Sequence, residues 1–273
     1  MADDAVSTAS VLKRFLLTDR VALVTGAGKG IGAGIALTLA EAGADVALVA
    51  RTQSDLDSVA DGVRAFGRRA LVFPADLNDL TQLPVLLEAV RTQLGGLDIL
   101  VNNAGGSASF PFLETRVENL EGSFHFNVSV TFELSRLAVP LLLERDGASI
   151  VNISSVAGSR AWRGGLVHGT MKAAISHMTQ LMAADLAPRI RVNAVLPGAV
   201  ETDALRRFLD ALDPSMRQLM KERTLMRRNG QPEDIAAAVM FFASPAASWV
   251  TGKLLEVDGS ASPDLVPMPI PDL

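Results

Sequence analysis

The chain has 273 residues, of which 49% are hydrophobic, so it can bury one large core. Its net charge of −5 offers no basic face for a nucleic acid, and the absence of cysteine excludes disulfides, thiolate metal sites and a cysteine nucleophile. The acidic start is unlike a signal peptide and no apolar run approaches membrane-spanning length, so we expect a cytoplasmic protein without a nucleic-acid, membrane or metal partner.

The first predicted strand covers 21–24, and it leads through a glycine-rich turn into a helix from Ile31 to Ala42. Unpaired backbone N–H groups at the start of such a helix, with the positive end of its dipole, form an anion site suited to a pyrophosphate. Gly26, Gly30 and Gly32 fit this interpretation, because a Cβ in the turn would hold the phosphates away from the backbone. A tight connection without a ligand is the alternative, and the flanking strand and helix favour the phosphate site.

The alternation of strands and helices continues along most of the chain. Further strands are predicted at 45–50, 70–73, 98–101, 149–153, 191–195 and 254–257. Helices are predicted at 54–66, 81–94, 166–187 and 232–243, together with a long helical region that ends near 143. Short apolar strands separated by helices are typical of an α/β fold with a doubly wound, parallel sheet covered on both faces.

The chain is predicted to form a single domain over 19–260, since no linker or internal repeat divides it. Residues 1–18 have little pattern and are expected to form a loosely held arm, and the tail 261–273 is rich in proline. The charged stretch 199–230 follows the sixth strand and is expected to close over a substrate as a lid. A permanently docked pair of helices is the alternative for this stretch.

Glycine or polar residues follow the predicted strands at the edge of the sheet where α/β proteins bind ligands. They are Gly26–Gly32 after the first strand and then, along the chain, Arg51, Asp76, Asn102, Ser155 and Pro197–Gly198. Because the carboxyl ends of parallel strands meet at one edge, these residues are expected to line a common cofactor site.

These residues and their spacing resemble the short-chain dehydrogenase/reductase family over about 18–260. The resemblance rests on Thr25–Gly32, Asp76-Leu77, Asn102–Gly105, Asn127, Ile153–Ser155, Lys172, Arg191–Asn193, and Pro197-Gly198 with Thr202. It implies a Rossmann-type, doubly wound and mainly parallel seven-stranded sheet, and hydride transfer between a nicotinamide dinucleotide and a carbonyl or alcohol carbon. It also implies a homotetramer or homodimer packed through the long helices near 117–143 and 166–187.

The resemblance also assigns residues to the cofactor. Asp76 is expected to hold the adenine, Asn102 to lie beside the cofactor and Thr202 to orient the carboxamide. The full set of expected cofactor-binding residues is Gly26, Gly28, Lys29, Gly30, Ile31, Gly32, Arg51, Asp76, Leu77, Asn103, Ala104, Gly105, Lys172, Pro197, Gly198, Val200 and Thr202.

Charge at the end of the second strand indicates which dinucleotide binds. An acid at this position would bind the ribose 2′-hydroxyl of NAD, whereas a 2′-phosphate requires cations. The position is Ala50, followed by Arg51, and Lys29 in the glycine turn is a second cation expected to reach the same pocket. Either cation alone could be a solvated surface charge. Together with the missing acid they predict NADP (NADPH), with NAD the less favoured cofactor.

The sequence departs from the family pattern at the catalytic centre. The pattern is Tyr-x-x-x-Lys with a serine thirteen positions before the tyrosine. Lys172 and Ser155 fit it, but His168 occupies the tyrosine position. The resemblance implies that the residue at 168 exchanges the proton, that the lysine lowers its pKa and binds ribose hydroxyls, and that the serine holds the substrate oxygen. Asn127 is expected to anchor a water that leads to the lysine.

Histidine can serve as a proton shuttle, since its reference pKa is roughly 6.5 against roughly 10 for tyrosine. The charge of Lys172 disfavours the imidazolium, so we expect a neutral ring that accepts a proton more readily than it supplies one. The resemblance, together with the charges at the end of the second strand, implies an NADP-dependent oxidoreductase that interconverts a small-molecule ketone and a secondary alcohol. A dinucleotide-binding protein with a lyase, isomerase or regulatory role is the alternative, as are a His168 that only fills space and an inactivated or engineered variant. Steroid-like, acyl-thioester, diketone and sugar substrates all fit the sequence.

Overall fold

The computed structural model describes residues 10–210 and 214–261, and the proline-rich tail beyond Ala261 lies outside the described residues. Seven strands form one parallel sheet in the order β3-β2-β1-β4-β5-β6-β7. The strands are β1 (Val21–Thr25), β2 (Asp45–Ala50), β3 (Ala70–Pro74), β4 (Ile99–Asn102), β5 (Ser149–Ile153), β6 (Arg191–Pro197) and β7 (Leu254–Val257). The predicted Rossmann-type α/β fold is confirmed.

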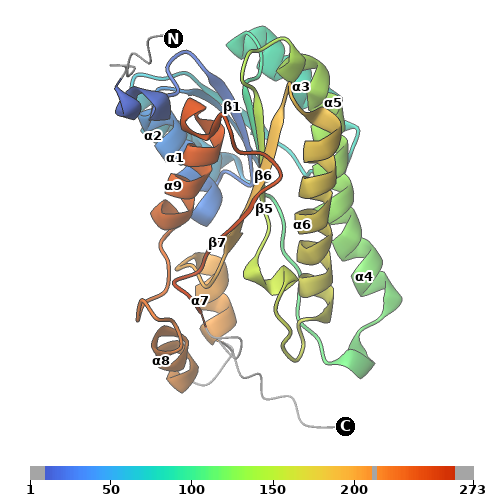
Figure 1. The fold of residues 1–273 in the computed structure, drawn as a ribbon. Helices are drawn as coiled ribbons and strands as arrows, with labels where there is room; N and C mark the ends of the chain where they lie inside the picture. Colours follow the sequence, from blue (N-terminus) through green and yellow to red (C-terminus); the bar gives the residue numbers. More distant parts are fainter. Residues whose placement is uncertain (1–9, 211–213, 262–273) are drawn as a thin grey trace, which may run out of the picture.

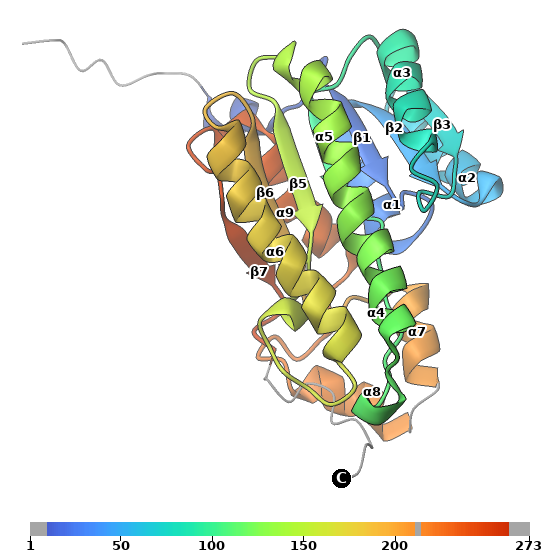
Figure 2. The same cartoon turned by 90° about the vertical axis from the view of Figure 1, so that its right-hand side faces the viewer.

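Helices cover both faces of the sheet (Figure 1, Figure 2). One face carries α1 (Gly30–Glu41), α2 (Gln53–Ala65) and α9 (Pro232–Ala243), and the other carries α3 (Gln82–Leu94), α4 (Val117–Phe124), α5 (Val130–Leu143) and α6 (Leu166–Leu186). Successive strand residues point to opposite faces, so Val24 joins the core beneath α1 and α9 whereas Leu23 joins the core beneath α3 and α5. Burial on both faces explains why the strands are continuous apolar runs in the sequence.

The strand order reverses between β1 and β4, which are paired although β2 and β3 separate them in the chain. At such a reversal the connections after the two strands leave in opposite directions, and a crevice opens between them. The glycine turn after β1 and the loop after β4 therefore flank the place where this fold binds a ligand.

The long helical region before residue 143 has three parts. A π-helical turn, His125–Ser129, joins α4 to α5 and carries Asn127. Contrary to the expectation from the sequence, the stretch Val117–Leu143 is long and apolar enough to cross a membrane by length and composition. Half of its most apolar window is buried inside the fold, so packing on the sheet and on α6 accounts for its hydropathy.

The described part of the N-terminal arm is attached to the end of α9. Val11–Phe15 forms one turn of 3-10 helix, and the Phe15 ring lies 6.3 Å from the ring of Phe241. Arg14 donates a hydrogen bond to the Ser248 hydroxyl at 2.8 Å, and Leu17 is buried.

In the described residues of the segment 199–230, the chain forms two helices, α7 (Asp203–Asp210) and α8 (Pro214–Glu222). A parallel bridge between Val200 and Gly230 closes the base of the segment. Leu209 and Met220, one from each helix, are buried. The segment is thus a pair of helices anchored at both ends rather than an open loop.

Candidate active site

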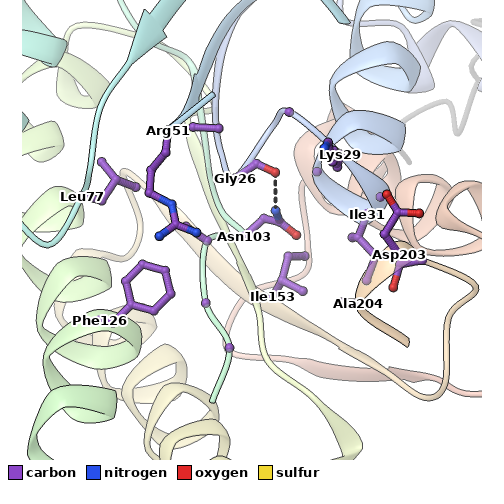
Figure 3. Close-up of a pocket in the computed structure, with 18 of the residues that line it drawn as sticks. Gly26, Lys29, Ile31, Arg51, Leu77, Asn103, Phe126, Ile153, Asp203 and Ala204 are labelled. Atoms are coloured by element: carbon purple, nitrogen blue, oxygen red, sulfur yellow. Dashed lines mark hydrogen bonds between the residues drawn. The ribbon is translucent and has the colours of Figure 1, made fainter. Parts of the chain in front are cut away.

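A cavity of about 570 Å³ lies at the carboxyl ends of the strands (Figure 3). Every residue expected to bind the cofactor lines it except Val200, and Ser155 and His168 line the same cavity. Val200 is buried in the bridge to Gly230, and Asn127 lies behind the cavity wall. The fold therefore brings residues that follow six different strands to one place, as the sequence predicts.

The turn after β1 is shaped for direct contact between the backbone and an anion. Gly26 and Gly30 have φ values of +64° and +55°, a region that favours glycine. A Cβ on Gly32 would lie 2.1 Å from the carbonyl oxygen of Gly26, so a side chain at this position would force the turn apart. Helix α1 begins after Lys29 with no side-chain cap and no acid in its first turn, which leaves its positive end to the cavity. These features fit a dinucleotide pyrophosphate.

Thr25 and Asn103 fasten this turn to the loop after β4. Thr25 Oγ1 accepts hydrogen bonds from the backbone N–H groups of Asn103 and Ala104, both at 3.0 Å. Asn103 Nδ2 donates to the carbonyl oxygen of Thr25 at 2.9 Å. It also donates to the carbonyl oxygen of Gly26 at 3.3 Å (Figure 3). The two sides of the crevice are therefore held at a fixed separation before any ligand binds.

Asn102 does not lie beside the cavity, contrary to the expectation from the sequence. Its amide donates to Asn152 Oδ1 at 2.9 Å and to Ser135 Oγ at 3.0 Å, inside the core. Neighbouring residues of an extended chain point to opposite sides, so Asn103, which was also expected to bind the cofactor, lines the cavity and Asn102 does not.

Three charged side chains lie around the end of β2. Arg51 extends from the strand end into the cavity, on the other side of Gly26 from Lys29 (Figure 3), and it forms no ion pair within residues 10–210 and 214–261. Lys29 Nζ lies 3.1 Å from Asp55 Oδ2. Asp55 lines the cavity from the first turn of α2, although the sequence did not suggest it. Lys29 thus reaches the pocket as expected, but its charge is paired.

Lys172 is buried beneath the loop that follows β4. Its ammonium donates to the carbonyl oxygen of Ile153 at 2.9 Å, and a Cβ on Gly105 would lie 3.3 Å from its Nζ. Burial lowers the pKa of Lys172 from 10.5 to about 8. The side chain is still mostly protonated at neutral pH, and it places a positive charge close to His168.

His168 lies one helical turn before Lys172 on α6, so the two side chains share a face. The pKa of His168 falls from 6.5 to about 4, first because the ring is buried and second because of the charge on Lys172. The ring packs against Trp162, with centroids 6.4 Å apart. The imidazole is therefore neutral at pH 7, and a neutral ring can take a proton from a hydroxyl group.

The hydroxyl of Ser155 is weakly held at the cavity wall. It accepts the N–H of Ala157 at 3.1 Å and donates to the carbonyl oxygen of Pro197 over 3.4 Å. A contact of 3.4 Å is at the long end for an O–H donor, so the proton can turn toward a substrate oxygen at little cost.

Asn127 supports the site from behind. Its Oδ1 accepts the N–H of Gly106 at 2.9 Å, and its Nδ2 donates to the carbonyl oxygens of Gly106 at 3.0 Å and of Ser123 at 2.9 Å. The side chain thus fixes the loop that lies over Lys172. Its part in holding a water stays a prediction.

Some cavity residues were not among those predicted from the sequence. They are Ala50, Thr52, Asp55, Ala75, Gly106, Phe126, Ile153, Ser154, Asp203, Ala204 and Arg207. The last three come from α7. Their place at the cavity could have been inferred from Thr202, which directly precedes α7. Thr202 Oγ1 accepts the N–H of Leu205 at 3.2 Å, so this predicted cofactor residue also starts α7 at the cavity edge.

Comparison with known proteins identifies the family. A family model described as enoyl-(acyl carrier protein) reductase matches residues 26–261. The chain belongs to the short-chain dehydrogenase/reductase family. An uncharacterized oxidoreductase of Mycobacterium tuberculosis is 47% identical over 264 residues, which are 96% of this chain and 100% of that protein. The 7α-hydroxysteroid dehydrogenase of Escherichia coli K12 is 38% identical over 250 residues, or 91% of this chain and 96% of the enzyme.

A solved structure of 7α-hydroxysteroid dehydrogenase, complexed with NADH and 7-oxo glycochenodeoxycholic acid, matches this fold with a TM-score of 0.88. The identity is 37%, and the match covers 93% of this chain and 99% of that one. The resemblance drawn from the sequence is confirmed. The short-chain dehydrogenase/reductase fold binds a nicotinamide dinucleotide, and the relatives of this chain are oxidoreductases of ketones and alcohols.

Proposed function

We propose that this protein interconverts a small-molecule ketone and a secondary alcohol with NADP, and that His168 transfers the proton. The observation that carries the proposal is the position of His168, which shares one cavity with Ser155, Lys172 and the glycine turn. A bound nicotinamide ring would donate or accept the hydride. The chain has to provide a proton site beside the reacting carbon, and the His168 imidazole and the Lys172 ammonium are titratable groups that line this cavity.

The electrostatics of the site favour oxidation of the alcohol at neutral pH. The His168 ring is already neutral, so it can take the hydroxyl proton while Ser155 Oγ holds the substrate oxygen. Reduction of the ketone requires the ring to be charged first. Burial and the positive charge of Lys172 both oppose that charge.

A substrate panel tests this activity. NADPH is offered with steroid-like, acyl-thioester, diketone and sugar ketones, and NADP⁺ with the matching alcohols, while nicotinamide absorbance is followed. We expect turnover with at least one pair, and faster ketone reduction in His168→Tyr, because a phenol can donate a proton at neutral pH. If neither the parent nor His168→Tyr turns over any ketone with NADPH or any alcohol with NADP⁺, the proton-transfer role of His168 is rejected.

The preference for NADP is supported by charge near the end of β2, the part of the cavity that we call the adenosine end. Arg51 and Lys29 both line it, and the end of β2 carries Ala50 in place of an acid. A charge-assisted contact to the 2′-phosphate is worth about 1.5–3 kcal/mol when well formed. NADPH should therefore bind more tightly than NADH in a fluorescence titration, and Arg51→Ala should narrow the gap. Equal affinities in the parent would overturn the assignment.

A second candidate is binding of the dinucleotide without redox turnover, in a lyase, isomerase or regulatory protein of this fold. The low pKa of His168 favours it, since a ring that stays neutral cannot supply the proton for ketone reduction. Tight binding of NADPH with no turnover across the panel, in either direction, would support this candidate over the first.

We also propose that 199–230 acts as a lid and that the protein is a homotetramer or homodimer in the cytoplasm. Apolar side chains exposed on α4, α5 and α6, among them Phe124, Phe132 and Leu181, support the oligomer.

The lid is supported by the cavity residues on α7. Hydrogen exchange in α7 and α8 should be faster than in the sheet and should slow when NADPH binds. Exchange as slow as in the sheet, with and without ligand, would contradict the lid.

A further inference from the structure

The adenosine end of the cavity holds a carboxylate that departs from the simple charge pattern of the sequence. A Cβ placed on Gly28 would lie 3.1 Å from Asp55 Cβ and 3.5 Å from Ala50 Cβ. Asp55 therefore stands beside Gly28 and next to the end of β2, where the strand itself carries no acid. Its carboxylate reaches Lys29, with 3.1 Å between Oδ2 and Nζ.

The neighbours of Lys29 leave little free positive charge on this side of the cavity. Asp55 pairs with it from α2. Asp203, at the start of α7, has a pKa below its ordinary value, chiefly through its hydrogen bond from Arg206 and in smaller part through Lys29. Of the two cations that favour a 2′-phosphate, only Arg51 is without a carboxylate partner within residues 10–210 and 214–261.

We propose that Asp55 is a specificity-determining residue that restrains the preference for NADPH over NADH. The carboxylate holds the Lys29 ammonium and repels a phosphate at the ribose 2′ position. The inference rests on the proposed NADP-binding function, and it identifies Asp55 as a residue that limits how strongly NADPH is preferred. It predicts a modest preference in the parent protein and a larger one when the carboxylate is removed.

The expected size of the effect follows from charge separation near a surface. A doubly charged phosphate and a carboxylate a few ångströms apart repel each other appreciably even in a wet site, and Lys29 becomes available when its partner is removed. Asp55→Asn should therefore tighten NADPH binding by about 10-fold, while NADH, which has no 2′-phosphate, should change by less than about 3-fold. The gain should shrink as salt is raised, since salt screens exposed charges.

Binding of both dinucleotides to the full chain tests this proposal without any turnover. Fluorescence titrations give the Kd values for the parent, Asp55→Asn, Lys29→Ala and the double variant. We expect the NADPH gain from Asp55→Asn to be smaller in the Lys29→Ala background than in the parent, because the freed ammonium is then absent and only the relief of repulsion remains. Asp57→Asn is the matched control: it removes a carboxylate from the same helix whose partner is Gln53 and which does not line the cavity. Thermal melts verify that every variant is folded.

Two results would overturn the role of Asp55. One is an NADPH affinity in Asp55→Asn that equals that of the parent. The other is a loss of NADH affinity of about 10-fold or more, which would show that the carboxylate binds the ribose hydroxyls directly. A parent that prefers NADH would reject the NADP assignment alone, because the role of Asp55 is measured by the change between variants.

Discussion

The two ends of the cavity are built from different parts of the chain. The dinucleotide end consists mainly of backbone: glycines with positive φ, the uncapped start of α1, and a turn fastened by Thr25 and Asn103. The proton-transfer end consists of side chains carried by α6, above all the buried Lys172 and the half-buried His168. A backbone site fails when a side chain is added, whereas a side-chain site changes its chemistry when a single residue is replaced. The resemblance to the family implies a tyrosine at position 168, so the histidine there is expected to be such a replacement.

The dinucleotide end should show the largest response to mutation. Gly32→Ala adds a Cβ 2.1 Å from the Gly26 carbonyl oxygen, so the turn has to move away from any phosphate. Forced overpacking costs about 1–3 kcal/mol or more, and we expect NADPH affinity to fall by at least about 10²-fold and stability to fall as well.

Gly122→Ala is the matched control for this substitution. Gly122 lies inside α4, and a Cβ there meets nothing within 4 Å. An alanine should therefore leave NADPH binding unchanged and stabilise the helix by about 0.5–1 kcal/mol. Equal cofactor affinity in Gly32→Ala and Gly122→Ala would refute the backbone description of this end.

The proton-transfer end should lose turnover and keep binding. His168→Phe removes the titratable group and retains a ring against Trp162, so alcohol oxidation should fall on the order of 10²-fold with NADPH affinity unchanged. Since the pKa of His168 is about 4, oxidation by the parent should stay level from pH 7 down to about 5 and fall below that. Full turnover in His168→Phe would place the proton source elsewhere. If alcohol oxidation by the parent instead fell near pH 6.5, the pKa of His168 would not be lowered by burial and by Lys172.

The sequence predicted most residues that line the dinucleotide end of the cavity, because the requirements of the glycine turn are local. Glycines at 26, 30 and 32, between an apolar strand and a helix, define the turn without knowledge of distant contacts. The failures arose where a contact joins separate segments. Asp55 lies beside Gly28 only because α2 folds back along β2, and no local pattern marks it.

For the proton-transfer end, the sequence predicted where the side chains lie but not how deeply they are buried. The spacing of Ser155, His168 and Lys172 was sufficient to place them in one cavity, and the charge of Lys172 was sufficient to predict a neutral imidazole. Burial, which is the larger cause of the low pKa, depends on Trp162 and on packing that the sequence does not specify. The direction in which a strand-end side chain points was likewise not specified: Asn102 was expected beside the cofactor together with Asn103, but Asn102 points into the core and only Asn103 of the two lines the cavity.

Burial of the charged Lys172 side chain should reduce the stability of the fold. The dinucleotide end is made mainly of backbone and carries no comparable cost. A pKa lowered from 10.5 to about 8 corresponds to about 3 kcal/mol at neutral pH, and loss of the hydrogen bond to Ile153 would return about 1 kcal/mol. Lys172→Met should thus raise the free energy of unfolding by about 2 kcal/mol at pH 7 while it weakens cofactor binding.

The pH dependence of the free energy of unfolding tests whether burial of the Lys172 charge causes this difference in stability. Between pH 8 and 10.5 the unfolded chain binds more protons at Lys172 than the folded chain, so the stability of the parent rises with pH there. The advantage of Lys172→Met should therefore narrow across that window in chemical denaturation. Lys253→Met, at an exposed position, controls for loss of a charge. A destabilised Lys172→Met at pH 7 would show that the ammonium contributes more than its burial costs.

The smallest expected effect concerns His168 and the stability of the fold in mild acid. The folded-state pKa of about 4 lies below the unfolded value of 6.5, so between these values the unfolded chain binds the extra proton and stability falls as pH falls. From pH 7.5 to 5.5 this one ring should reduce the free energy of unfolding by about 1 kcal/mol. Urea denaturation of the parent and of His168→Phe at both pH values isolates this contribution, since all other groups titrate in both proteins. The parent should lose more stability than His168→Phe by that amount. An identical loss in the two proteins would mean that the imidazole takes up its proton in the folded state, and the two ends of the cavity would then differ less in their electrostatics than the structure indicates.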